Sequence, residues 1–117
     1  MPGRSFCIRP GLIVGSFDPT ERFTWWVRRV ATGGEVLAPE GPHVPIQLID
    51  VRDLSDWTIR SIETGLTGTY NATGPAEVLS FGTLINECIK ALEVDAQVTW
   101  TSLFLLPGSF LPRFWGW

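Results

Sequence analysis

Few side chains in this sequence have the type and spacing that catalysis requires. His43 is the only histidine and lies between prolines, and no G-x-S-x-G turn presents a serine to it, so we do not expect a Ser/His/Asp triad. Glu35 and Glu40 lack a paired carboxylate and are expected on the solvated surface. The sequence therefore predicts no catalytic residue of its own.

The two cysteines, Cys7 and Cys88, lie in apolar surroundings and belong to no C-x-x-C pair. Such cysteines are typical of buried thiols in a reducing compartment, rather than of a disulfide or a metal site. With a single histidine in the chain, we also expect no zinc cluster and no other metal site.

Composition restricts the possible partners. The chain has 117 residues, 44% of them apolar and 18% charged, with a net charge of −3. The acidic balance argues against a nucleic-acid partner, because phosphate binding needs a cationic face. The basic pair Arg28 and Arg29 is expected on a solvated helix face. The apolar run 103–106 is too short to span a bilayer, and no signal-peptide pattern precedes Arg9, so we expect no membrane partner and a cytoplasmic location.

Hydrophobic periodicity predicts alternating strands and helices. A buried strand is expected over residues 6–14, interrupted at Pro10 and Gly11. The run Asp18–Glu21 is typical of a helix start, in which Asp18 caps the free N–H groups. The following apolar face ends at Gly33–Gly34; it consists of Phe23, Trp26, Val27 and Val30.

The rest of the chain continues the alternation. Strands are expected over 35–38, 46–51, 69–72 and 97–100, with a turn at 73–75. Asp53 is expected to cap a helix that ends near Gly65. Ser80 is expected to cap the clearest helix, whose apolar face is Phe81, Leu84, Ile85, Cys88, Ile89 and Leu92. This order favours an α/β fold with parallel pairing.

Three segments carry a family likeness: Ile8-Arg9-Pro10-Gly11-Leu12-Ile13-Val14-Gly15, Ile49-Asp50-Val51-Arg52-Asp53-Leu54, and Gly68-Thr69-Tyr70-Asn71-Ala72-Thr73-Gly74-Pro75. In this order and spacing, the chain resembles the C-terminal part of NAD(P)-dependent epimerases and dehydratases, the extended short-chain dehydrogenases/reductases. The resemblance runs from about Ser5 to Leu92. It implies a partial Rossmann-type parallel sheet plus small C-terminal substrate-domain elements, over residues 1–100, followed by an apolar, Trp-rich tail over 101–117.

The resemblance also implies site residues. Pro10, Gly11, Leu12 and Ile13 would lie against the nicotinamide end of NAD or NADP, although a kinked core strand is an equal interpretation.

Four further residues, Phe17, Asp18, Arg22 and Gln47, would border the substrate pocket. For Asp18, a helix cap is the alternative to a ligand role.

Departures from the family pattern limit this interpretation. The family's Gly-rich cofactor turn has no counterpart, and the family's catalytic Tyr-x-x-x-Lys pair is missing, because Gly74 stands four residues after Tyr70. Ile46 lies near the position where nucleotide-sugar epimerases of this family carry an arginine for the diphosphate. An isoleucine cannot hold a phosphate, so we expect a small substrate rather than a UDP- or dTDP-sugar.

The resulting hypothesis is a C-terminal fragment, itself inactive, of an enzyme that transfers hydride between nicotinamide and a carbonyl or alcohol carbon. A separate N-terminal half would complete it, and a homo-oligomer is the other partner to be expected. The alternative is a non-catalytic interaction or assembly module that docks through tryptophan and phenylalanine side chains. Its docking residues would be Trp25, Trp26, Phe110, Phe114, Trp115 and Trp117, although helix packing is the simpler interpretation of the first two.

Overall fold

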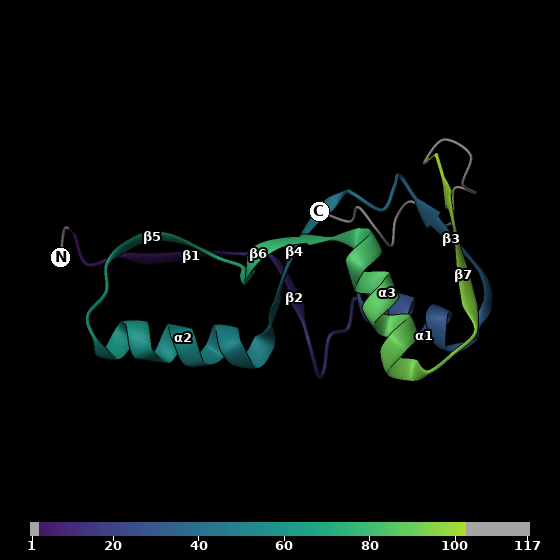
Figure 1. Cartoon of the computed structure of the whole chain (residues 1–117). Coiled ribbons are helices and arrows are strands. Elements are labelled where there is room, and N and C mark those ends of the chain that lie inside the picture. Colours follow the sequence, from purple (N-terminus) through teal and green to yellow (C-terminus); the bar gives the residue numbers. More distant parts are fainter. Residues whose placement is uncertain (1–2, 103–117) are drawn as a thin grey trace. The chain divides into compact units, whose positions relative to one another are not determined.

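The computed structural model describes residues 3–102 and has an α/β fold (Figure 1). The chain forms two compact units, one from Met1–Asp18 and Gln47–Val78, the other from Pro19–Ile46 and Leu79–Trp117. We call these the first and the second unit. The elements of the described part are β1 (Phe6–Pro10), β2 (Leu12–Val14), α1 (Thr24–Ala31), β3 (Gly34–Pro39), β4 (Pro45–Asp50), α2 (Val51–Glu63), β5 (Gly68–Ala72), β6 (Gly74–Ser80), α3 (Phe81–Leu92) and β7 (Ala96–Thr101).

The predicted α/β class with parallel pairing is confirmed. β1 pairs with β5, β2 with β4, and β3 with β7, each in parallel. Parallel neighbours need a crossover between them, and each of these pairs has a helix between its strands in the sequence. β6 joins the second of these sheets, in the order β2-β4-β6. β6 was not predicted: residues 73–75 were expected to form a turn, and no strand was expected between them and Ser80.

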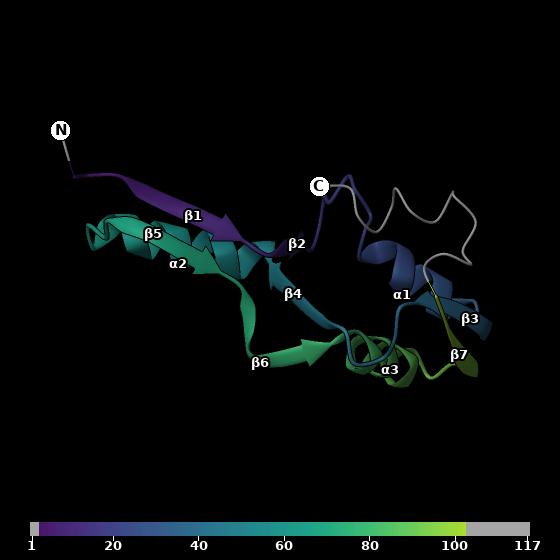
Figure 2. The ribbon, with the colours of Figure 1, turned by 90° about the horizontal axis from the view of Figure 1, so that it is seen from above.

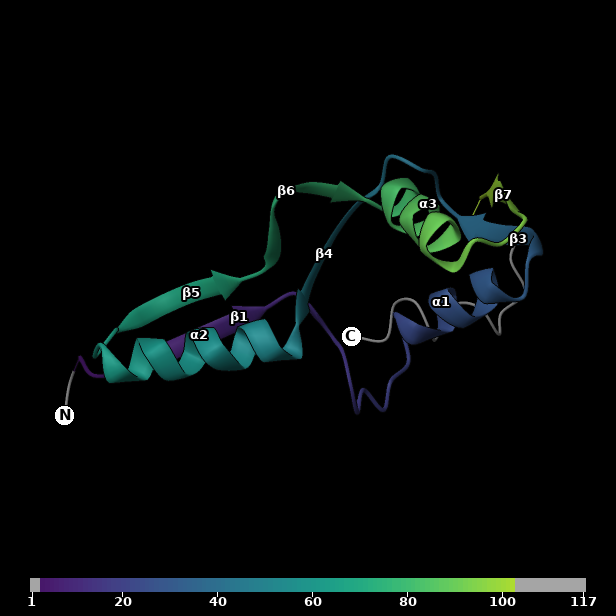
Figure 3. The same cartoon turned by 60° about the horizontal axis from the view of Figure 1, so that its bottom comes forward.

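In the first unit, α2 lies along β1 and β5 (Figures 2 and 3). The strands pair in register from Phe6 opposite Gly68 to Pro10 opposite Ala72. Three aromatic rings join the helix to the strands: the centroid of Phe6 lies 5.4 Å from that of Trp57 and 5.9 Å from that of Tyr70. Such tilted aromatic contacts add to the stabilisation that burial of the rings provides.

The start of α2 corrects one prediction. The N-cap is Asp50, whose side chain accepts a hydrogen bond of 2.8 Å from the amide of Arg52. Asp53 was predicted to cap this helix, but it lies in the first turn, where its charge favours the N-terminal end of the helix dipole. The strand and the helix follow each other without a loop, so the cap is the last strand residue.

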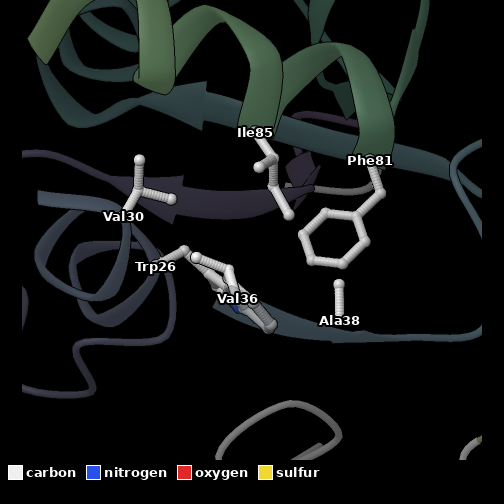
Figure 4. Close-up of a cluster of buried hydrophobic side chains, with 6 residues drawn as sticks. All are labelled: Trp26, Val30, Val36, Ala38, Phe81 and Ile85. Atoms are coloured by element: carbon white, nitrogen blue, oxygen red, sulfur yellow. The ribbon is translucent and has the colours of Figure 1, made fainter. Parts of the chain in front are cut away.

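The second unit contains the main hydrophobic core of the described residues. Figure 4 shows Phe81 and Ile85 of α3 pointing toward β3, beside side chains of α1. This cluster consists of Trp26, Val30, Val36, Ala38, Phe81 and Ile85. These members confirm the predicted apolar faces of α1 and α3 in the core, and Leu84, Cys88 and Ile89 pack against it. Leu92 was also predicted on the apolar face, but it is the last residue of α3 and is 38% exposed. On β3, the alternate residues Glu35 and Leu37 are exposed, as the period of a strand with one buried face requires.

The two helices of this unit begin differently. α3 starts as predicted: the Ser80 hydroxyl accepts a hydrogen bond from the amide of Thr83 at 3.1 Å. α1 begins at Thr24, not at the predicted Asp18, and its N-cap, Phe23, makes no side-chain cap bond. Glu21 has a positive φ of 52°, a left-handed conformation that interrupts any helix through the capping-box residues.

Burial is distributed unequally between the units. Among the described residues, the first unit buries only Val14 and Ala72 of its hydrophobic side chains, whereas the second unit buries the whole cluster. Most exposed large hydrophobic side chains belong to the first unit: Ile13, Phe17, Ile59, Ile62 and Val78. The first unit therefore has little core of its own. Burial of apolar surface is the main stabilising term in folding, so this unit gains less from it than the second unit does.

Candidate functional site

The candidate site lies in the first unit, where the chain exchanges one strand partner for another. Pro10 is opposite Ala72 of β5, whereas Leu12 is opposite Leu48 of β4. Between them, the amide of Gly11 donates a hydrogen bond to the carbonyl of Ala72 at 3.1 Å. The predicted break at Pro10-Gly11 is therefore confirmed as the point where β1 ends and β2 begins.

Packing explains why a glycine stands at this point. A β-carbon at Gly11 would lie 3.0 Å from the carbonyl oxygen of Gln47 and 3.2 Å from Cγ2 of Thr73. Both contacts are closer than ordinary van der Waals distance, and the nearer one is to backbone. β4 and the residue after β5 thus both approach the chain at Gly11, which has no side chain. The amide of Gly11 is not free to bind a ligand, because it is bonded to Ala72.

The four residues predicted to contact the cofactor differ in accessibility. Pro10 is exposed, Gly11 and Leu12 are half-buried, and 37% of Ile13 is exposed. Pro10 is the last residue of β1, and Leu12 and Ile13 belong to β2, which continues past the carboxyl ends of β1 and β5. Open α/β sheets bind ligands at the carboxyl ends of their strands. Pro10 and Ile13 are the two accessible apolar side chains of this segment.

The described residues do not provide a matching phosphate site. A dinucleotide pyrophosphate is usually held by free amides at a helix N-terminus after a Gly-rich turn. Here α2 and α3 begin with Asp50 and Ser80, whose side chains occupy first-turn amides. Gly33 and Gly34 follow α1 and precede a strand. The described residues therefore offer no pyrophosphate site of this kind.

The predicted substrate residues are divided between the units. Phe17 is fully exposed, with a positive φ of 68°, while Gln47 is exposed and Asp18 half-buried in the same unit. Arg22 belongs to the second unit, where its Nε donates to the Thr20 hydroxyl at 3.3 Å. A shared pocket of these four residues stays a prediction.

Asp50 and Arg52 form an ion pair at the junction of β4 and α2. Nε and one terminal nitrogen of Arg52 donate to the two carboxylate oxygens of Asp50 at 3.0 and 2.9 Å. These side-chain bonds, with the bond from the Arg52 amide, lower the pKa of Asp50 from 3.8 to about 2. The same pairing raises the pKa of Arg52. Asp50 is therefore an ionised helix cap, not a proton donor or acceptor at neutral pH.

The described residues contain no acid–base pair of the Tyr–Lys type. The hydroxyl of Tyr70 donates to the carbonyl of Thr67 at 3.0 Å, and its ring packs with Phe6 and Trp57. Lys90, the only lysine of the sequence, lies in the other unit and forms an ion pair with Glu87 at 2.7 Å.

Both cysteines were predicted to be buried, but neither is fully buried. Cys7 is exposed on β1, because its side chain points to the strand face opposite that of Phe6 and Ile8. Cys88 is half-buried against the core, and burial raises the pKa of its thiol. Within residues 3–102, no group of three His, Cys, Asp or Glu side chains could hold a metal ion.

None of the helices in the described part of the chain is long and apolar enough to cross a membrane. The predicted tail over 101–117 lies almost entirely outside the described residues.

Comparisons with known proteins show similarity at the level of fold. No protein-family profile and no curated protein matches the chain. A dTDP-4-dehydrorhamnose reductase from Clostridium acetobutylicum superposes with a TM-score of 0.69 at 16% identity, over 87% of this chain and 35% of that one. A UDP-N-acetylglucosamine 4-epimerase from Bacillus cereus superposes with a TM-score of 0.64 at 14% identity, over 92% of this chain and 38% of that one. The fold is shared.

These matches confirm the predicted Rossmann-like α/β class. The chain spans little more than a third of the length of each of the two solved proteins.

Two features of the first unit were not predicted from the sequence: the contact of Gly11 with Gln47 and the capping role of Asp50. The Pro-Gly pair signalled a break in the strand, but no local signal identifies which distant strand approaches it.

Proposed function

We propose that this chain is the C-terminal part of an NAD(P)-dependent reductase, epimerase or dehydratase, and that it is inactive alone. The whole enzyme would transfer hydride between nicotinamide and a carbonyl or alcohol carbon. This part would contribute one wall of the nicotinamide site through Pro10–Ile13. The remaining residues of the fold, in a preceding segment or a separate chain, would supply the phosphate-binding turn and the proton-transfer pair.

The strand exchange at Gly11 is the observation that carries this proposal. It leaves Pro10 accessible at the carboxyl end of β1 and Ile13 accessible within β2, in a fold shared with a reductase and an epimerase. Ligands of open α/β sheets bind where neighbouring strands part in this way. The role of this chain would be to orient the nicotinamide and exclude water from one side of it, with no proton transfer by its own residues.

For the substrate, we propose a small carbonyl or alcohol compound. The two solved proteins are named for dTDP- and UDP-linked sugars. In this chain, Ile46 stands near the position of the arginine that would pair with such a diphosphate, and it packs against the apolar core. An apolar side chain in that setting offers no donor to a phosphate.

Nuclear magnetic resonance of the labelled full chain tests the cofactor wall. We expect nicotinamide mononucleotide, at roughly millimolar concentration, to shift the amide signals of Gly11, Leu12 and Ile13. ADP serves as the matched control, because it carries the half of the cofactor that this chain does not fit. Equal shifts with ADP, or no shifts with nicotinamide mononucleotide, would contradict the proposal.

The alternative of a Trp-rich docking module is weakened by burial. Trp26 is 3% exposed and belongs to the core, and Trp25 packs edge-on against it with ring centroids 4.7 Å apart. Both rings therefore stabilise the second unit, as in the helix-packing interpretation. The other four aromatic residues of that hypothesis lie outside the described residues.

A further inference from the structure

We draw no further inference here: the strongest candidate, the face of the β1–β5 sheet that carries the exposed side chains of Cys7, Arg9, Thr69 and Asn71, is a surface for which nothing in the structure shows what covers it.

Discussion

Gly11 lies so close to Gln47 that a β-carbon on Gly11 would be 3.0 Å from the Gln47 carbonyl oxygen and 3.1 Å from its carbonyl carbon. The contact joins the end of β1 to β4 at the point where the chain leaves β5. It fixes the position of the exposed residues on either side, Pro10 and Ile13.

The first prediction concerns this contact. Gly11→Ala should destabilise the first unit by about 1–3 kcal/mol, the usual cost of overpacking. Thr73→Ala should recover little of the loss, because the closest contact is to the Gln47 backbone, which cannot move aside like a side chain. Denaturant unfolding measures the change. Gly41→Ala is the control, since a β-carbon there meets nothing within 4 Å; an equal loss at both glycines would contradict the prediction.

The second prediction concerns pH and the cap of α2. The pKa of Asp50 is lowered from 3.8 to about 2 by its bonds to Arg52. A lowered folded-state pKa means that the stabilisation is complete above pH 3.8 and is lost as the pH falls toward 2. We expect the amides of the first turn of α2 to lose protection in this window. Asp50→Asn should remove the step while keeping a cap oxygen.

A carboxyl signal of Asp50 that titrates at 3.8 would show that the pair with Arg52 does not form. As a comparison at neutral pH, Asp50→Ala should reduce the helicity of α2 more than Asp53→Ala does. Only Asp50 bonds a first-turn amide through its side chain.

The third prediction concerns the core of the second unit. Ile85 is 1% exposed, so Ile85→Ala should destabilise this unit by about 2–5 kcal/mol through lost burial and the cavity left behind. Leu92→Ala, on the same helix at a site 38% exposed, should cost no more than about 1 kcal/mol. Thermal unfolding followed by tryptophan fluorescence reports the difference, because Trp26 lies in this core. Similar losses for the two variants would mean that the cluster is not the core.

The fourth prediction concerns the two units of the chain. Hydrogen exchange should be at least about tenfold slower for the amides of β3 and β7 than for those of β1 and β5, since protection follows local stability. The buried cluster covers β3 and β7 of the second unit. The first unit, which contains β1 and β5, buries only Val14 and Ala72 of its described hydrophobic residues. The measurement is made on dilute wild-type chain, and uniform protection across both pairs would contradict it.

The sequence by itself determined most elements and their order. Ser80 caps α3 as predicted, because a cap depends only on a side chain and an amide three residues away. The apolar faces of α1 and α3 followed from helical spacing, and the strand break followed from Pro10-Gly11. These features are local, so the periods and turn chemistry of short segments are sufficient to predict them.

Only the tertiary structure decided which segments meet. The contact of Gly11 with Gln47 and Thr73 depends on strands distant in the sequence, and no local rule specifies such a partner. Asp50 rather than Asp53 caps α2 because β4 extends to the first residue before the helix. The exposure of Cys7 and the burial of Trp26 likewise depend on which face of a strand or helix is covered. Periodicity identifies an apolar face, but burial depends on the element that packs against it.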